Sequence, residues 1–287
     1  MERLCFYYHF IRKYAMKTLL CCIVKNENRY IDEWITYHKS IGFDDIIIYD
    51  NNDKDGETLD VEKYDFVKVI DFRGKYIEVL DPTKCVYNPF MGGVQEWAFT
   101  DCYLNHSAEY DWIAFLDADE YLVIDNGLTL VEFLAKDEFI DADAIQINWQ
   151  IYGDNGNILY DSKPLQERFT TPSKKQLPFV KSIVKTKNPN FIRMRGHNAI
   201  IYQGKYVYPN GNETKCSISQ RDNYEGARIK HYFTKTIDEW IDRRYKKVSV
   251  DGVSWINQGD TCIKQFFIFN DWSEDKQKVI EKKMGSI

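Results

Sequence analysis

Residues 18–50, TLLCCIVKNENRYIDEWITYHKSIGFDDIIIYD, predict a buried strand, an amphipathic helix and a second buried strand. Residues 18–24 and 45–49 are continuous apolar runs rich in β-branched side chains, which is typical of strands buried on both faces. Between them, residues 29–40 carry apolar side chains three and four positions apart, the spacing of one helix face, and Gly42 can end that helix. This order favours an α/β domain with a largely parallel sheet.

The same alternation of strands and helices continues to about residue 150. The fold class it predicts is α/β, with a Rossmann-like, mostly parallel central sheet flanked by helices. Turns are more frequent beyond residue 153, but no linker rich in Gly or Ser interrupts the chain, so we expect the second half to continue the same domain. The further predicted elements are strands at 66–72, 112–116, 144–152 and 179–186, and helices at 94–104, 128–134 and 237–248.

Polar side chains follow three of the predicted strands. Lys25-Asn-Glu27 follows the first strand, Asp50-Asn-Asn follows the second, and Asp117-Ala-Asp119 follows the strand at 112–116. In parallel sheets, ligands bind in the crevice beyond the carboxyl ends of the strands. The sequence therefore predicts a binding site where these three strand ends meet.

The composition excludes several classes of protein. The chain has 287 residues, of which 44% are hydrophobic and 29% charged, so it can form a sizeable core. Only 15 Gly and 7 Pro residues are present, too few for a collagen-like or disordered chain. A formal net charge of −6 argues against nucleic acid as the main partner. Aromatic residues reach 15%, which suits stacking on flat apolar faces such as those of sugars, although we expect most of the rings in the core.

The cysteines and the two ends of the chain bear on localisation. Seven cysteines without a CxxC pair favour reduced thiols, and no apolar run approaches the roughly 18 residues of a membrane span. Residues 1–15 lack the features of a secretory signal, so we predict an N-terminal extension there, a main domain over 16–262 and a C-terminal helical segment over 263–287. We expect a cytoplasmic protein. The last segment mixes apolar and Lys-rich stretches, and it either packs on the body or lies peripherally on the inner face of a membrane.

Asp117 and Asp119 form an Asp-x-Asp pair directly after a buried strand. The same spacing occurs twice elsewhere, but only this pair follows an apolar strand that would hold both carboxylates rigidly. Two hard oxygen ligands so placed suit Mg²⁺ or Mn²⁺, which share their coordination with substrate phosphates. The alternative is a turn in which the aspartates cap backbone amides.

His231 is the preferred candidate for a third metal ligand. It lies where a strand-like run meets a helix, and Lys235, four residues later, could contact a phosphate. His197, in the segment Arg195-Gly-His-Asn198, competes for the same role. A structural histidine is the alternative for either one.

Several short motifs occur in the order found in one family of enzymes. Their combination, spread over residues 18–248, resembles the domain of glycosyltransferase family 92, whose members are related to the large family 2 glycosyltransferases. The motifs are Val24-Lys-Asn-Glu27, Tyr30-Ile-Asp-Glu-Trp34, Tyr37-His38, Gly42, Ile48-Tyr-Asp-Asn51, Gln95, Cys102, Trp112-Ile-Ala-Phe-Leu-Asp-Ala-Asp-Glu120, Trp149-x-x-x-Gly153, Glu167-Arg-Phe169 and His231-Tyr with Lys235.

The resemblance implies an A-type glycosyltransferase fold, a nucleotide-sugar donor, a divalent metal held by the Asp-x-Asp pair and, usually, inversion at the anomeric carbon. Asp50 and Glu27, at two strand ends, are placed to bind a uracil and a ribose, or else they are surface carboxylates of turns. The candidate donor-binding residues are Lys25, Glu27, Asp50, Gln95, Asp117 and Lys235.

A glycosyl transfer also needs a base for the acceptor hydroxyl, because that hydroxyl loses a proton as it attacks. Asp154, in the turn after the strand at 144–152, is the first candidate. Glu167 is the second, since the neighbouring Arg168 would lower the pKa of its carboxyl group and weaken it as a base.

These features together predict a metal-dependent, inverting glycosyltransferase. It would move a hexose, galactose or glucose, from a UDP-sugar to a hydroxyl of a glycan or glycolipid, with Mn²⁺ or Mg²⁺ bridging the diphosphate of the leaving group. One alternative is a catalytically inactive, glycan-binding relative. Another is a sugar-phosphate nucleotidyltransferase, which normally opens with a Gly-rich loop, whereas residues 18–30 contain no Gly.

Overall fold

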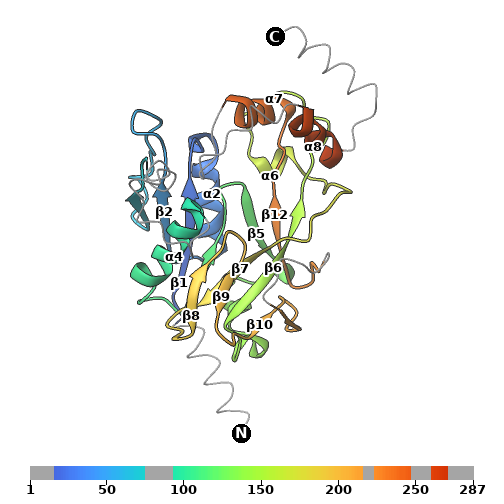
Figure 1. The fold of residues 1–287 in the computed structure, drawn as a ribbon. Helices are drawn as coiled ribbons and strands as arrows, with labels where there is room; N and C mark the ends of the chain where they lie inside the picture. Colours follow the sequence, from blue (N-terminus) through green and yellow to red (C-terminus); the bar gives the residue numbers. More distant parts are fainter. Residues whose placement is uncertain (1–15, 75–92, 216–222, 247–259, 271–287) are drawn as a thin grey trace. The chain divides into compact units, whose positions relative to one another are not determined.

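The computed structural model describes residues 16–74, 93–215, 223–246 and 260–270, and within these ranges ten strands form one sheet (Figure 1). Eight strands follow one another in the order β11-β10-β6-β7-β4-β1-β2-β3, and β12 pairs with β5 and β6. The strands are β1 (Thr18–Val24), β2 (Asp45–Asp50), β3 (Val67–Asp71), β4 (Trp112–Phe115), β5 (Glu120–Ile124), β6 (Ala144–Ile151), β7 (Val180–Lys185), β10 (Tyr206–Val207), β11 (Glu213–Thr214) and β12 (Ala227–His231).

The strands predicted from the first part of the sequence form the parallel part of the sheet. β1 lies between β2 and β4 and runs parallel to both, and β2 runs parallel to β3. Every residue of β1 is buried, as its unbroken apolar run predicts. β7 pairs antiparallel with β4 and β6, so the sheet is mixed at that side. The predicted α/β class with a mostly parallel sheet is confirmed.

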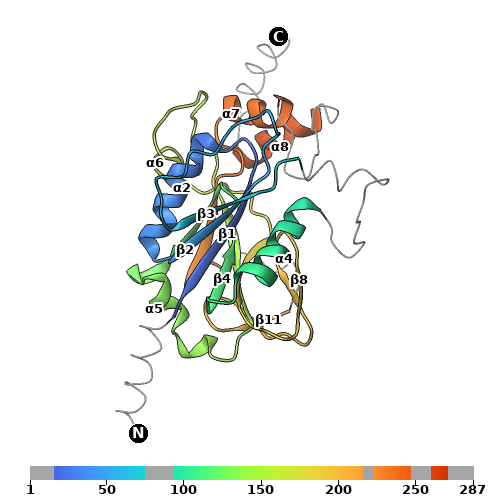
Figure 2. The same cartoon turned by 90° about the vertical axis from the view of Figure 1, so that its left-hand side faces the viewer.

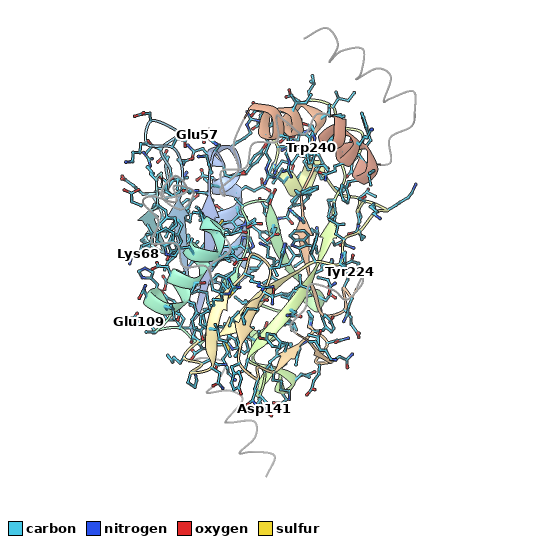
Figure 3. The ribbon with its side chains drawn as sticks, viewed as in Figure 1. Glu57, Lys68, Glu109, Asp141, Tyr224 and Trp240 are labelled. Atoms are coloured by element: carbon cyan, nitrogen blue, oxygen red, sulfur yellow. The ribbon has the colours of Figure 1, made fainter. Side chains whose placement is uncertain are left out.

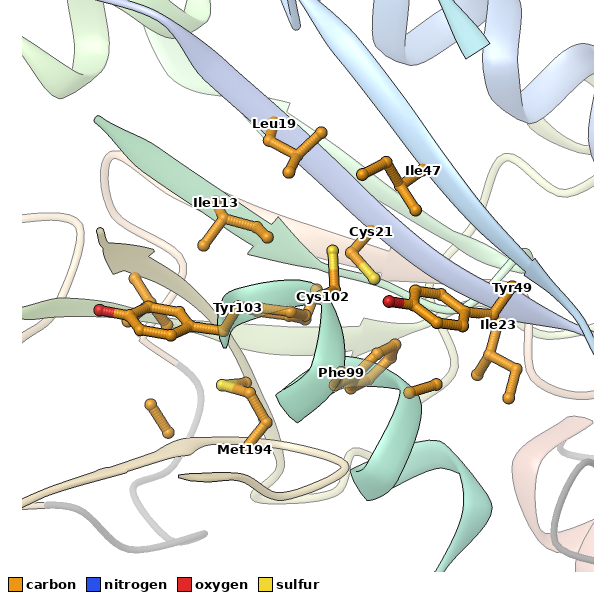
Figure 4. Close-up of a cluster of buried hydrophobic side chains, with 14 of the residues drawn as sticks. Leu19, Cys21, Ile23, Ile47, Tyr49, Phe99, Cys102, Tyr103, Ile113 and Met194 are labelled. Atoms are coloured by element: carbon orange, nitrogen blue, oxygen red, sulfur yellow. The ribbon is translucent and has the colours of Figure 1, made fainter. Parts of the chain in front are cut away.

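Different elements cover the two faces of this parallel part (Figure 2). α4 (Val94–His106) and the hairpin of β8 (Phe191–Met194) and β9 (Ala199–Ile201) lie on one face. Cys21, Phe99, Cys102, Ile113 and Met194 belong to the apolar cluster that they bury there (Figure 4). α2 (Asn28–Ile41) and α5 (Leu130–Leu134) lie on the other face. Two short 3₁₀ helices of the described residues, η1 (Asp125–Gly127) and η2 (Asp137–Phe139), flank α5 in the sequence.

α2 has the buried face and the ending that its sequence predicts. Ile31, Trp34, Ile35 and His38 are its buried residues, all on the predicted apolar stripe. Gly42 then takes a left-handed conformation with φ 112°, which costs glycine little, and its N–H caps carbonyl groups of the last turn.

The buried face of α2 also fixes β5, a strand that the sequence analysis did not predict. The Trp34 Nε1–H donates to the Glu120 carbonyl at 2.9 Å, and the Tyr37 hydroxyl donates to the Leu122 carbonyl at 2.8 Å. The Leu122 N–H donates to His38 Nε2 at 3.4 Å. The sequence analysis predicted no strand directly after Asp117 and Asp119, but Glu120 is the first residue of β5.

The described residues fall into two compact units. The first comprises residues 16–74, 93–149, 178–215 and 223–230, and the second comprises residues 150–177, 231–246 and 260–270. The predicted N-terminal extension, residues 1–15, lies outside the described residues. The predicted boundary between residues 262 and 263 falls inside α8 (Asp260–Asn270), and the threefold division of the chain stays a prediction.

The second unit contains three short helical elements and α8. α6 is Leu165–Arg168, α7 is Ile237–Ile241, and a π-helical turn over Asp242–Lys246 follows α7 where the sequence predicted one continuous helix. Trp240 of α7 (labelled in Figure 3) packs with Phe266 and Phe267 of α8 in a small apolar cluster. Within the described ranges, no helix is both long enough and apolar enough to cross a membrane.

Candidate active site

The polar ends of β1 and β2 are joined by hydrogen bonds. The Asn51 N–H donates to the Val24 carbonyl at 3.0 Å, and the Asn26 N–H donates to Asn52 Oδ1 at 2.7 Å. Asn26 has a left-handed backbone with φ 59°, a conformation that Asn accepts more readily than most residues. The chain therefore turns sharply after β1.

The candidate donor-binding residues at these two ends are engaged with the protein itself. The buried Lys25 ammonium lies 2.7 Å from Asp53 Oδ1. Both carboxylate oxygens of Asp50 accept hydrogen bonds, one from the Asn52 N–H and one from Arg73 Nε, each at 3.0 Å. These contacts anchor the loop after β2. Glu27, half-buried, supplies the carbonyl that begins α2.

Asp117 is the centre of the site in the first unit. Gln95 Nε2 of α4 donates to Asp117 Oδ1 at 2.6 Å, and the Lys181 ammonium of β7 lies 3.0 Å from Asp117 Oδ2. The same ammonium lies 3.3 Å from Glu120 Oε2 and donates to the Gly196 carbonyl at 3.0 Å. Two elements distant in sequence, α4 and β7, thus orient one carboxylate, and the predicted binding of a nucleotide sugar by Gln95 stays a prediction.

Lys181 and Glu120 are site residues that the sequence analysis missed. Lys181 is 2% exposed and Glu120 is fully buried, whereas the side chain of Asp117 is 29% exposed. Glu120 Oε2 also accepts the Asp117 N–H at 2.9 Å. A lysine inside an apolar strand, as at position 181, was the available signal, because such a charge is buried only when it is paired.

Burial and paired charges shift the pKa values of these groups. Burial by itself lowers the pKa of Lys181, but the carboxylates of Asp117 and Glu120 outweigh it and the pKa is raised. Burial raises the pKa of Glu120, an effect that Lys181 opposes and Asp117 reinforces. Burial also raises the pKa of the nearby Cys22 thiol, with Asp117 adding to the shift, which disfavours the thiolate form.

The residues around Asp117 fit a divalent metal ion as part of its ligand set. A carboxylate offers about four lone-pair sites, and the bonds from Gln95 and Lys181 use two of them. Hydrogen bonds that orient a ligating carboxylate are usual around bound metals. Asp119 is buried two residues further on. Within the described part of the chain, no three or more His, Cys, Asp and Glu side chains are grouped to hold a metal by themselves.

In the second unit, Asp154 lies in a tightly bonded turn. Its Oδ1 accepts the Gly156 N–H at 2.9 Å, and its own N–H donates to Asn270 Oδ1 at 2.5 Å. Asn157 Nδ2 donates to the Asp154 carbonyl at 2.9 Å. The position of Asp154 is therefore fixed by its own turn and by α8.

The other candidate base, Glu167, is exposed on α6. The sequence analysis expected the Arg168 guanidinium to lie against Glu167. It instead forms a buried, bidentate ion pair with Glu239, at 2.9 and 3.0 Å. A planar guanidinium binds a carboxylate best in this way. Arg168 therefore joins α6 to α7.

The two candidate histidines have different surroundings. His231 is buried at the end of β12, with its ring against Phe233 at 5.4 Å, and its carbonyl accepts the Tyr152 N–H at 3.0 Å. His197, in the first unit, stacks on Phe179 with 4.9 Å between ring centroids and lies edge-on to Trp149.

Lys235 is buried and has a strained, left-handed backbone with φ 55°. The next residue, Thr236, forms a capping box with Glu239 that begins α7. A buried lysine in a strained conformation at a helix start is typical of functional positions. The role of Lys235 at a phosphate nevertheless stays a prediction.

A mostly parallel α/β sheet flanked by helices, with oriented carboxylates beyond its strand ends, defines a fold like that of A-type glycosyltransferases. The sequence model of glycosyltransferase family 92 matches residues 17–284, so the chain belongs to that family, and the resemblance noted in the sequence is confirmed.

Plant proteins of this family are similar to part of the chain. A family 92 protein of Oryza sativa subsp. japonica is 30% identical over 128 residues, which is 43% of this chain and 19% of that protein. One of Ricinus communis is 30% identical over 111 residues, or 39% of this chain and 18% of that protein. One of Arabidopsis thaliana is 28% identical over 107 residues, or 36% of this chain and 16% of that protein. The matched part thus covers under a fifth of each relative.

Proposed function

We propose that the protein is a metal-dependent, inverting glycosyltransferase that moves a hexose, galactose or glucose, from a UDP-sugar to a hydroxyl of a glycan or glycolipid. Its family supports the glycosyl transfer with a sugar donor and a glycan acceptor. The observation that carries the finer proposal is the Asp117 carboxylate, which Gln95 and Lys181 orient and which stays partly exposed beyond the end of β4.

In this proposal Asp117, Asp119 and His231 hold Mn²⁺ or Mg²⁺. When bound, the metal supplies Lewis-acid stabilisation of the negative charge that develops on the departing diphosphate. Gln95 and Lys181 keep the Asp117 carboxylate in one orientation, so it need not reorganise when the donor binds. Lys235 binds a phosphate, and Lys25, Glu27 and Asp50 line the nucleoside side of the donor site.

Asp154 is the proposed general base, and Glu167 is the second candidate. A direct displacement needs one carboxylate that accepts the proton of the acceptor hydroxyl, and it inverts the anomeric carbon. The turn around Asp154 supports this role because its bonds hold the carboxylate in place before the acceptor binds. We also propose action in the cytoplasm, on the grounds that Cys21, Cys22 and Cys102 are free thiols.

The test is transfer from a panel of UDP-sugars, and Asp119→Asn should abolish it without unfolding the protein. The substitution keeps the size of the side chain but removes the charge that attracts a divalent cation. Asp141→Asn is the matched control, because Asp141 opens another Asp-x-Asp sequence and is exposed (Figure 3). Wild-type transfer in excess EDTA would refute the metal dependence, and an α-linked product from an α-linked donor would refute inversion.

One observation favours a second candidate, the inactive, glycan-binding relative. Both oxygens of Asp117 already accept bonds from side chains of the protein, an arrangement that also suits a purely structural carboxylate. Hydrolysis of UDP-sugar in the absence of acceptor separates the two candidates, since an inactive relative releases no UDP.

A further inference from the structure

The last residue of α8 is bonded to two segments that carry proposed site residues. Asn270 Oδ1 accepts the Asp154 N–H at 2.5 Å and the Thr234 hydroxyl at 3.2 Å. Thr234 directly precedes Lys235, so one amide oxygen bridges the turn of the proposed base and the segment of the proposed phosphate-binding lysine. These two segments lie about 80 positions apart in the sequence and come together at this oxygen.

Asn270 is itself held in one orientation. Its Nδ2 donates to the Phe266 carbonyl one turn back in α8 at 2.8 Å, which fixes the amide so that Oδ1 faces the turn. α8 is anchored in turn, since Phe266 packs with Trp240 of α7 and the Phe269 ring lies 5.4 Å from Phe233. The acceptor oxygen is therefore held against α8 by the bond from its own amide Nδ2 to the Phe266 carbonyl.

The turn approaches α8 so closely that a side chain at position 153 would crowd the helix. A Cβ added to Gly153 would lie 3.0 Å from Asn270 Oδ1 and 3.2 Å from the Phe269 carbonyl. Both distances are shorter than usual for a methyl group, and the second partner is backbone, which cannot rotate away. Gly153 allows the turn to approach α8, and Asn270 bonds the turn there, so both residues determine the same contact between the turn and the helix.

We propose that Asn270 is a positioning residue for Asp154, and that α8 is part of the acceptor side of the active site. The inference rests on the proposed role of Asp154 as general base. Asn270 bonds the backbone of Asp154, so it sets where the carboxylate stands and leaves both carboxylate oxygens to other partners. A displacement of about 1 Å at a reacting group can cost about 10²-fold in rate.

The experiment measures kcat and the affinity for UDP in Asn270→Ala, Gly153→Ala and the double variant. Each single variant should lower kcat about 10- to 100-fold, because the turn of Asp154 shifts, while the affinity for UDP stays unchanged. The double variant should lose no more than the worse single variant, since both act on one contact. Asn270→Asp keeps an acceptor oxygen for both bonds but loses the Nδ2–H donor to the Phe266 carbonyl, so it should recover part of kcat.

Lys264→Ala is the matched control, because Lys264 lies exposed on the same helix. Wild-type kcat in Asn270→Ala, with Asp154→Asn inactive, would overturn the inference and leave the proposed base in place. The inference would also be overturned if the losses of kcat multiplied in the double variant, or if Asn270→Asp were as slow as Asn270→Ala. An active Asp154→Asn would instead refute the base itself, and a wild-type protein that transfers no sugar would refute the proposed function.

Discussion

At the scale of single residues, the orientation of Asp117 depends on a buried charge. The Lys181 ammonium lies 3.0 Å from Asp117 Oδ2 and 3.3 Å from Glu120 Oε2, and the side chains of Lys181 and Glu120 are at most 2% exposed. Removing one member of a buried ion pair leaves its partner uncompensated, and this usually costs more than the pair contributed. Lys181 therefore affects both folding and the orientation of the Asp117 carboxylate.

Lys181→Met should lower the free energy of unfolding by about 3–5 kcal/mol, because Glu120 is left buried without its cation. Urea denaturation measures the loss. Adding Glu120→Gln should recover part of it, since the double variant contains no uncompensated buried charge. Lys185→Met is the control from the same strand, where the ammonium bonds the Ile140 carbonyl at the surface. Equal stabilities of Lys181→Met and the wild type would show that the buried pair is not what holds these strands.

At the scale of elements, α2 and β5 behave as one unit. His38 is buried between them, its Nδ1 2.9 Å from the Trp34 carbonyl and its Nε2 accepting the Leu122 N–H. With Nε2 as acceptor, Nδ1 must carry the proton and donate, so both ring nitrogens are used by the neutral ring. Burial lowers the pKa of His38 to about 3.

The stability of the protein should fall as the pH drops from about 6.5 towards 3, with His38 contributing about 1.4 kcal/mol per pH unit. In this range the unfolded chain binds a proton at His38 and the folded protein does not, so acid favours unfolding. His38→Gln can replace both hydrogen bonds without titrating. It should therefore remove the contribution of His38 to the change of the free energy of unfolding with pH. Urea denaturation at several pH values tests it, with His106→Gln as the partly exposed control. An unchanged slope in His38→Gln would contradict the argument.

The sequence predicted the helices and strands whose apolar residues form a pattern within a short stretch of the chain. β1, α2 and β2 appear where residues 18–50 place them, because continuous runs and helical spacing are visible within a few residues. β5 was missed because its first residue, Glu120, belongs to a carboxylate cluster that resembles a turn. The partners of Asp117 could not be predicted in full either, since Lys181 lies 64 positions further along the chain and only the sheet brings the two together.

At the scale of the whole molecule, the proposed site residues belong to both compact units. Asp117, Asp119 and Gln95 belong to the first, and Asp154 and His231 belong to the second. The grouping of polar side chains at the strand ends was predictable because parallel strands share one edge. The hydrogen bond between the Asp154 N–H and Asn270 Oδ1 was not predictable, since a bond across 116 positions leaves no local pattern in the sequence.

UDP and Mn²⁺ together should raise the midpoint of thermal unfolding, and EDTA should abolish the shift. A ligand that binds only the folded state stabilises it by about 2.7 kcal/mol at a concentration of 100 times Kd. Differential scanning fluorimetry gives the midpoint, with Asp119→Asn as the variant that should show no shift. A shift of the same size in Asp119→Asn, or with UDP in EDTA, would contradict the proposed metal site.

The close approach of the β8–β9 turn to α4 has a consequence for natural variation. A Cβ added to Gly196 would lie 2.8 Å from Gln95 Oε1, and Gln95 is the donor to Asp117. A larger residue at position 196 would push the Gln95 amide away from the carboxylate, whereas a shorter residue at position 95 would make room for it. The two positions, 101 residues apart, should therefore change together as the family diversifies, each limiting what evolution permits at the other.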